Sequence, residues 1–244
     1  MKNLKNTIAL IILTIACNTF AVAQLSDAFI SNNGELSNND FTVKNEVDNS
    51  QEIVKKFYYN ADGHLVCQRN YDFESRLAYD ERGVSIYEYQ YDANNNITEE
   101  RYFDEEKNYF KQESIGAAII KRQFDTNNRV IEISYFLDEQ TKLQFGTSSI
   151  KYNYSADGTS AIEKHFAPDG QLVDFCAPIV LVEFNGTGQI IKKTYQTSEQ
   201  KTCGRFMDGD KDEVAVIMYE YDNGKLINQK AFNKEGKLIG EIPA

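Results

Sequence analysis

The stretch YYNADGHLV, residues 58–66, places two tyrosines before a polar turn of Asn, Asp and Gly and ends in an apolar pair. The chain repeats this arrangement five more times. The further copies are YDANNNIT (91–98), FDTNNRVI (124–131), YSADGTSAI (154–162), FNGTGQII (184–191) and YDNGKLI (221–227). From Tyr59 onward, the aromatic residues that open the turns are 32, 33, 30, 30 and 37 residues apart, so the chain is built on a sequence repeat.

Each copy carries the residue types of a tight β-turn. The residue after the aromatic one is Asn, Asp or Ser, whose short side chain can bond the backbone two residues further on. Gly or Asn follows at the position where a hairpin tip needs positive φ, which these residues tolerate. The residues at that position are Gly63, Asn95, Asn128, Gly158, Gly188 and Gly224. The pattern predicts six hairpin tips.

The segments that flank these tips are predicted strands. Apolar and aromatic residues alternate before the tips, as in Tyr87, Tyr89 and Tyr91, which is the period of a half-buried strand. Apolar pairs such as Leu65-Val66 follow the tips. Looser second tips are predicted at YDERGV (79–84), FAPDGQLV (166–173) and FNKEGKLI (232–239).

The predicted fold class follows from these two strands and two turns per period. One hairpin is marginally stable in water, so the units must stack on one another. We therefore expect an all-β fold: stacked antiparallel β-hairpin repeats forming a curved or partly rolled sheet of roughly 12 to 15 strands.

Residues 1–23 are predicted to be a signal peptide. Lys2 and Lys5 give a basic start, an apolar run covers 7–17, and Ala21-Val22-Ala23 supplies a small-x-small cleavage pattern before Gln24. The apolar run is shorter than the roughly 20 residues that span a bilayer. A lipid anchor on Cys17 is the alternative. Either reading predicts export to the periplasm, the cell surface or the extracellular space of a bacterium.

The rest of the chain is divided at residue 50. Residues 24–50 are rich in Asn and are predicted to be a polar N-terminal cap or linker, and residues 51–244 a single β-hairpin repeat domain. No second apolar stretch is long enough to cross a membrane, so no transmembrane segment is expected after signal cleavage.

Charge and cysteine content exclude further classes. Cleavage removes two lysines and moves the formal charge from −11 to −13, which disfavours a nucleic-acid partner because phosphate backbones are negative. Three cysteines remain, Cys67, Cys176 and Cys203, so at most one internal disulfide can form. The pair Cys176 and Cys203 is favoured because it flanks one repeat, and the pairing stays open.

The segments YDANNNIT and YEYDNGKLINQKAFNKEGKLIG (219–240) resemble the tyrosine-aspartate (YD, or RHS-type) repeats of bacterial surface proteins. They are also similar to the short Y-x-x-x-G-K-L repeats of MORN-like bacterial proteins. The resemblance covers roughly residues 53–240 and implies stacked hairpins, with no catalytic residues to carry over. Large RHS proteins are shells that enclose a toxin, and a chain of this length has too few strands for that role.

A possible metal site lies in the segment DGDKDE, where Asp208, Asp210 and Asp212 alternate as the first ligands of a calcium loop do. Glu213 occupies the position where such a loop needs Gly, and Tyr219 the position of the bidentate Glu. A solvated acidic loop is the favoured interpretation. We expect no cofactor, with a weak calcium site as the alternative.

No nucleophile elbow, phosphate loop or zinc-ligand spacing occurs, so we expect no enzymatic activity. The favoured function is an exported non-catalytic β-repeat protein with a binding or structural role at the bacterial cell envelope, and a protein or glycan partner. The alternative is a glycan-binding module that uses exposed tyrosines. Its candidate strip is Tyr87, Tyr89, Tyr152 and Tyr219, for which packing between hairpins is the competing interpretation.

Overall fold

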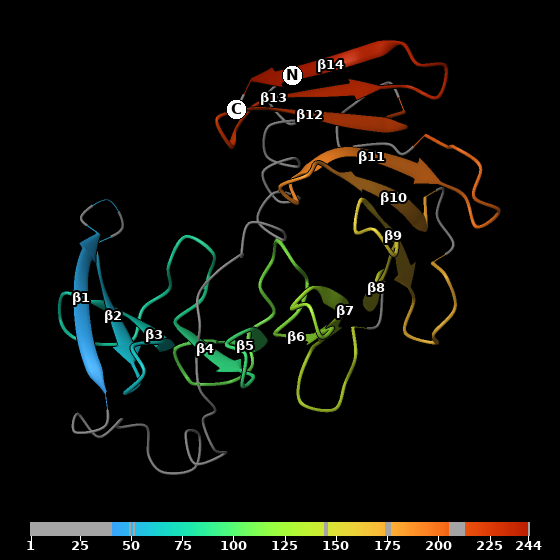
Figure 1. The fold of residues 1–244 in the computed structure, drawn as a ribbon. Helices are drawn as coiled ribbons and strands as arrows, with labels where there is room; N and C mark the ends of the chain where they lie inside the picture. The colour runs from blue at the N-terminus through green and yellow to red at the C-terminus, as the bar shows by residue number, and fades with distance from the viewer. Residues whose placement is uncertain are drawn as a thin grey trace. The chain divides into compact units, whose positions relative to one another are not determined.

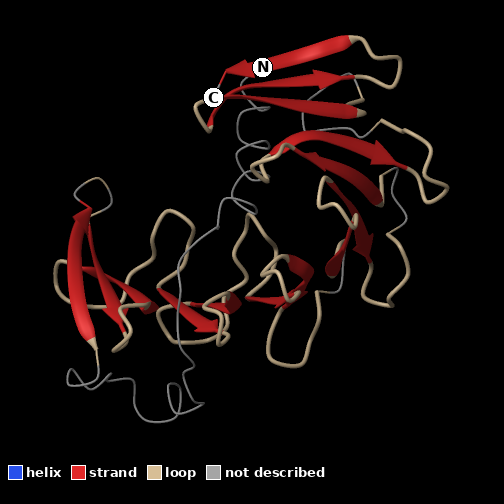
Figure 2. Ribbon diagram, in the orientation of Figure 1, coloured by secondary structure: helices blue, strands red, loops and turns tan. Residues whose placement is uncertain are grey.

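The computed structural model describes residues 41–48, 50, 52–143, 146–173, 177–204 and 213–243. They fall into two compact units, named here the N-terminal unit (described residues up to 143) and the C-terminal unit (from 146 onward). The described residues form β-strands and turns and no helix (Figure 2), which confirms the predicted all-β class. None of the described segments is therefore a helix that could cross a membrane. The predicted signal peptide lies outside the described residues.

The N-terminal unit is an open antiparallel sheet in which each strand pairs with its neighbour along the chain (Figure 1, blue to green). Its strands are β1 (Thr42–Asp48), β2 (Ile53–Tyr59), β3 (Leu65–Asp72), β4 (Ile86–Tyr91), β5 (Ile97–Phe103), β6 (Ile119–Phe124) and β7 (Val130–Phe136).

The C-terminal unit repeats the same strand order (Figure 1, yellow to red). Its strands are β8 (Ser149–Tyr154), β9 (Ser160–Phe166), β10 (Ile179–Phe184), β11 (Ile190–Gln196), β12 (Val216–Asp222), β13 (Lys225–Phe232) and β14 (Leu238–Pro243). The prediction of stacked antiparallel hairpins is confirmed in both units.

The hairpin tips have the predicted turn chemistry. In the tip at 92–96, the Asp92 carboxylate accepts hydrogen bonds from the backbone N–H groups of Asn94 and Asn96, both at 2.9 Å. Asn95 has a positive φ of 76° and Asn128 one of 59°, which few residue types other than Gly tolerate. A shift of register accompanies the tip, between Gln90 and Tyr91, as expected for a turn that ends in a bulge.

A second set of tips lies at the opposite ends of the strands, and the sequence analysis located only part of it. The structure places a turn directly after Tyr71, Phe103, Phe136, Phe166 and Gln196, and each of these residues forms a β-bridge with the residue six positions later. The predicted second tip YDERGV (79–84) is instead an additional turn, which follows the tip at 72–76 and precedes β4. The first connector therefore contains one more turn than predicted.

The tyrosine that opens a tip also joins neighbouring hairpins. The Tyr91 hydroxyl donates to the Leu65 carbonyl at 2.5 Å, and the Tyr221 hydroxyl donates to the Ile190 carbonyl at 2.9 Å. In both cases the acceptor is the first residue of the strand that follows the preceding tip. The hydroxyl therefore explains why tyrosine suits this position, beyond the packing of its ring.

Replacing Tyr91 or Tyr221 with Phe is expected to lower the free energy of unfolding by about 1 kcal/mol each, because one partly buried hydrogen bond is lost. Urea unfolding monitored by circular dichroism measures this. Tyr59→Phe is the matched control, since no hydroxyl contact of Tyr59 occurs among the described residues. Equal losses in all three variants would show that the hydrogen bonds donated by Tyr91 and Tyr221 contribute nothing to stability.

Polar and charged side chains are buried beside the apolar core of the N-terminal unit. The core cluster contains Tyr58, Val66, Cys67, Ile86, Tyr91 and Phe103. Next to it on β5, Glu99 and Arg101 are each only 8% exposed and pair at 2.5 Å. Arg101 also reaches Glu139 at 3.1 Å, so this ion pair ties β5 to the segment after β7. Burial of this kind makes the pair costly to break.

Candidate functional site: a groove on the first connector

The candidate site lies on the first connector, residues 73–85, which joins β3 to β4. Its first turn is held by Asp72, whose carboxylate accepts the backbone N–H groups of Glu74 and Arg76, both at 2.9 Å. Ser75 adopts a positive φ of 66° in this turn. The geometry is that of an Asx turn, in which one side chain replaces a backbone acceptor.

The middle of the first connector is fixed to the sheet by Asn70, which is fully buried. The backbone N–H of Ala78 donates to the Asn70 carbonyl at 3.0 Å, and the Asn70 side-chain amide donates to the Val84 carbonyl at 2.9 Å. A buried amide of this kind needs partners, and here the connector supplies them. Hydrogen bonds to Asn70 therefore hold the backbone of the first connector against the sheet.

The last turn of the first connector is held by Asp80. Its carboxylate accepts the backbone N–H groups of Arg82 at 2.9 Å and Val84 at 3.1 Å, and the Tyr87 hydroxyl at 2.5 Å. The hydrogen bond from Tyr87 links the connector to β4 and orients the segment 77–79 between its two turns. That segment forms the floor of the site.

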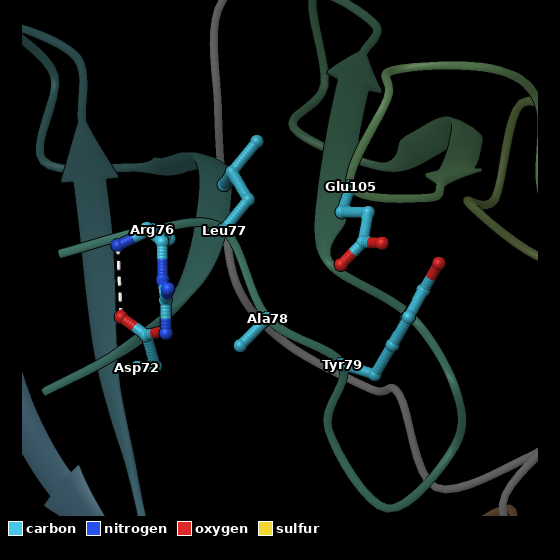
Figure 3. Close-up of a pocket in the computed structure, with 6 residues that line it drawn as sticks. All are labelled: Asp72, Arg76, Leu77, Ala78, Tyr79 and Glu105. Atoms are coloured by element: carbon cyan, nitrogen blue, oxygen red, sulfur yellow. Dashed lines mark hydrogen bonds and ion pairs between the residues drawn. The ribbon is translucent and has the colours of Figure 1, made fainter. Parts of the chain in front are cut away.

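An open groove of about 530 Å³ runs over this connector and is lined by Asp72, Arg76, Leu77, Ala78, Tyr79 and Glu105. Figure 3 shows Asp72 and Arg76 on one side and Tyr79 and Glu105 on the other, with Leu77 and Ala78 between them. Glu105 comes from the second connector, residues 104–118, which joins β5 to β6. The groove thus lies between two successive repeats.

Two aromatic rings are exposed on the first connector, and one of them, that of Tyr79, lines the groove. Phe73 is 59% exposed and Tyr79 is 45% exposed. Among the described residues, they are the aromatic members of the set of large apolar side chains that stand in solvent. Exposed aromatic rings are enriched where proteins bind partners, because they supply large contact area at low entropic cost.

In the part of the chain that the structure describes, charged groups are paired on the Arg76 side of the groove and unpaired at Glu105 on the other side. The Arg76 guanidinium contacts the carboxylates of Asp72 and Glu74, each at 2.8 Å, so its charge is compensated. Among the described residues, the Glu105 carboxylate has no hydrogen-bond or ion-pair partner. Desolvation raises the pKa of the Tyr79 hydroxyl, and the negative charge of Glu105 raises it further. The Tyr79 side of the groove is therefore negative.

The predicted aromatic strip falls partly in the core. In the N-terminal unit, Tyr87 is 5% exposed and its ring meets that of Tyr102 edge-on, with centroids 5.6 Å apart. Tyr89 is half-buried and packs against the core cluster of that unit. Burial raises the pKa values of both hydroxyl groups. Tyr87 is therefore a packing residue, and its ring is not open to a ligand.

In the C-terminal unit, Tyr219 is 9% exposed and belongs to the core cluster with Tyr195 and Ile217. Tyr152 is half-buried and hydrogen-bonds the carboxylate of Glu163. Tyr219, like Tyr87, is enclosed, so these two residues correct the expectation of an open strip. The exposed rings are Phe73 and Tyr79, which the sequence analysis did not select.

A buried polar cluster in the C-terminal unit was also not predicted. His165 Nε2 lies 2.7 Å from the Glu163 carboxylate, and His165 Nδ1 lies 3.3 Å from the Thr147 hydroxyl. Glu163 and Lys193 are 7% and 5% exposed. Burial alone raises the pKa of Glu163, but the charge of Lys193 and the His165 contact outweigh it and hold this pKa at about 2. We assign the cluster to the stability of this unit, because its carboxylate and ammonium groups are enclosed.

The predicted calcium ligands Asp208, Asp210 and Asp212 lie outside the described residues, as does Cys176. Within the described ranges, no three His, Cys, Asp or Glu side chains gather as a metal site. Cys67 is buried, and this burial raises the pKa of its thiol to about 12. The calcium and disulfide hypotheses remain predictions.

Gly204 and Glu213, the described residues on either side of 205–212, are in close contact. A Cβ atom on Gly204 would overlap the Cβ atom and carboxylate of Glu213. Gly204→Ala is therefore expected to destabilise the C-terminal unit by about 1–3 kcal/mol, as measured by thermal or urea unfolding. Gly186→Ala is the matched control, because nothing lies within 4 Å of a Cβ atom there. Equal stability of the two variants would contradict this close contact.

Comparison with known proteins adds little to this description. No protein-family model and no curated protein match the chain. A similar solved structure is described as "Crystal Structure of TcdB2-TccC3-TEV", with 11% sequence identity and a TM-score of 0.35 over 75% of this chain. The match covers 10% of that chain, so the present chain spans about a tenth of its length. Likeness at this level assigns no family, and the β-repeat architecture rests on the spacing and register of this chain itself.

Proposed function

We propose that this chain is an exported, non-catalytic protein of stacked YD-type β-hairpin repeats that binds another macromolecule at the bacterial cell envelope. The groove of the first connector is the proposed contact surface. The observation that carries the proposal is the exposure of Tyr79 in a groove whose floor is hydrogen-bonded to the sheet, with the exposed Phe73 directly after the lining residue Asp72 in sequence. Rigid exposed rings at a pre-formed hollow are typical of binding surfaces.

A capture experiment tests the proposed surface. Tagged wild-type protein, the double variant Phe73→Ser/Tyr79→Ser and the control Ile227→Ser/Leu238→Ser are immobilised and exposed to an envelope extract of the source organism. The control removes two apolar side chains that are each 46% exposed in the C-terminal unit. We expect a bound species, quantified by mass spectrometry, that wild type and control retain and the groove variant loses. Identical retention by all three proteins would refute the groove as the contact surface.

Export is supported by the basic start, short apolar run and small-x-small pattern of residues 1–23. The intact mass of protein recovered from the envelope fraction is expected to correspond to a chain that begins at Gln24. A mass that corresponds to a lipid-modified chain starting at Cys17 would support the anchored alternative, and an uncleaved chain in the cytoplasm would contradict export.

Glycan binding is the second candidate, and the same exposed ring favours it. Tyr79 has a supported, half-exposed ring with carboxylate and guanidinium groups nearby, and such groups can hydrogen-bond sugar hydroxyls. A glycan array probed with wild type and the Phe73→Ser/Tyr79→Ser variant separates the two candidates. Signals that depend on the two rings would favour a glycan over a protein partner.

A further inference from the structure

The Tyr79 ring has another aromatic ring beside it and is partly open to solvent. It packs against Phe110 of the second connector, with ring centroids 6.3 Å apart. Phe110 in turn approaches Gly83 so closely that a Cβ atom there would lie 3.0 Å from its Cζ atom. The ring of Tyr79 therefore has a packed neighbour in Phe110, while 45% of the residue remains exposed.

The second connector gives this ring an acidic surrounding. Asp104 and Glu106 both accept hydrogen bonds from the Asn108 side-chain amide, at 3.2 and 3.3 Å. Glu105 lines the groove itself, and its carboxylate has no partner within the described ranges. Lys107, in the same turn, is not a lining residue of the groove. An unpaired carboxylate next to an open aromatic ring is the combination that attracts an organic cation.

The two walls of the groove differ in whether their charged groups are free to bind a ligand. On the Arg76 side, the guanidinium is engaged by Asp72 and Glu74, and Asp72 also accepts two backbone N–H groups. On the Tyr79 side, the aromatic ring and the Glu105 carboxylate remain open. Leu77 and Ala78 lie between the walls and offer apolar surface for the methylene stem of a long side chain.

We infer that the groove receives a positively charged segment of a partner protein, which places a Lys or Arg side chain over the Tyr79 ring with its charge against Glu105. This inference rests on the proposed function and names the chemistry of the partner for the same site. The whole chain carries a formal charge of −11, which steers basic partners toward it. Charge complementarity thus favours a basic peptide over a neutral sugar or an anionic membrane.

Fluorescence anisotropy with two defined probes tests the inference. One probe is a labelled, end-capped peptide of alternating Lys and Gly, and the other is the same peptide with every Lys acetylated. Both are titrated with the full chain and its variants Glu105→Gln, Tyr79→Leu and Glu235→Gln at two salt concentrations. Glu235→Gln removes one exposed carboxylate from a tip of the C-terminal unit and is the charge-matched control.

We expect the lysine peptide to bind wild type and the acetylated peptide to bind far more weakly. Glu105→Gln and Tyr79→Leu should each weaken binding roughly fivefold, while Glu235→Gln changes it less than about twofold. Equal weakening by Glu105→Gln and Glu235→Gln would overturn the inference, because it would show non-specific attraction to an acidic protein. Absence of lysine-peptide binding would also overturn it.

The failure of this inference is distinct from failure of the proposed function. If the lysine peptide does not bind but the Phe73→Ser/Tyr79→Ser variant still loses a species captured by wild type, the groove binds a partner of other chemistry. If ring-dependent signals arise on the glycan array instead, the occupant is a sugar. Binding of the chain to anionic lipid vesicles that depends on Tyr79 would likewise contradict a basic occupant.

Discussion

Arg101→Met is expected to lower the free energy of unfolding of the N-terminal unit by about 3 kcal/mol, because the buried Glu99 carboxylate loses its closest counter-charge and keeps only the more exposed Lys121, at 3.3 Å. Arg101 and Glu99 are each 8% exposed and lie 2.5 Å apart. Arg101 also contacts Glu139 at 3.1 Å. Met keeps most of the volume of the side chain, so the loss reports mainly on charge.

The neighbouring Glu88 makes this substitution more severe. Burial raises the pKa of Glu88, and the positive charges of Arg101 and Arg69 lower it again. Without Arg101, the pKa of Glu88, which is already raised in the folded state, should rise further above its unfolded value. The folded state then binds more protons than the unfolded state, so the deficit in stability should be larger at pH 7 than at pH 5.

Urea unfolding of wild type, Arg101→Met and Arg101→Met/Glu99→Gln at both pH values measures these effects. The double variant should recover part of the loss, because Glu99 no longer carries a buried charge. Arg82→Met removes an exposed arginine of the first connector and is expected to stay within about 0.5 kcal/mol of wild type. A similar small change for Arg101→Met would show that the buried network is not a source of stability.

The second large effect is expected from Glu163 in the C-terminal unit. Its pKa of about 2 lies below the ordinary value of 4.5, because Lys193 and His165 outweigh the cost of burial. A depressed folded-state pKa contributes stability that is fully present above the unfolded pKa and is lost as pH falls toward the folded pKa. The C-terminal unit should therefore lose about 3 kcal/mol of stability between pH 5 and pH 2.

Glu163→Gln should remove this acid dependence and should also cost about 3–5 kcal/mol at pH 7, because Lys193 remains buried without its counter-charge. Unfolding by urea at pH 7, 5 and 3 checks both expectations. Glu220→Gln is the control: Glu220 pairs with Lys230 at the surface, so its loss should change the pH profile far less than the loss of Glu163 does. Parallel pH profiles for wild type and Glu163→Gln would show that the folded state does not lower the pKa of the Glu163 carboxylate.

The tips that sequence predicts are those with a strong local signal. At Asn95, Asn128 and Gly158 the residue type itself tolerates positive φ, and the preceding Asp or Ser starts the turn, so the tip is visible from about five residues. The strands beside these tips are predicted by an equally local signal, the alternation of tyrosines and other apolar residues.

Three of the second tips lack Gly or Asn at the position of positive φ. Ser75, Lys107 and Gln200 adopt positive φ although none of these residue types favours it, so their turns are imposed by the bridge that closes them. The traces of these tips in the sequence are the turn-starting Asp72 and Asp104 and the spacing of the preceding aromatic residues. Tyr71, Phe103, Phe136 and Phe166 follow one another at 32, 33 and 30 residues, matching the period of the first tips.

The candidate groove depends on contacts that no local pattern encodes. Tyr79 and Tyr87 are only eight residues apart, yet Tyr87 is 5% exposed and Tyr79 is 45% exposed. The Tyr87 hydroxyl donates to Asp80 at 2.5 Å, whereas the Tyr79 ring lies beside that of Phe110 on the second connector. A choice among tyrosines by alternation alone therefore selects the enclosed ring.

The pairing of each strand with its immediate chain neighbours, seen throughout both units, has a consequence for how this protein is made and altered. Strand pairing then joins only segments that follow one another along the chain, a topology that allows folding from several starting points. An added or deleted segment of one full period leaves every remaining partnership intact, so such a chain can lengthen or shorten in whole modules without a new topology.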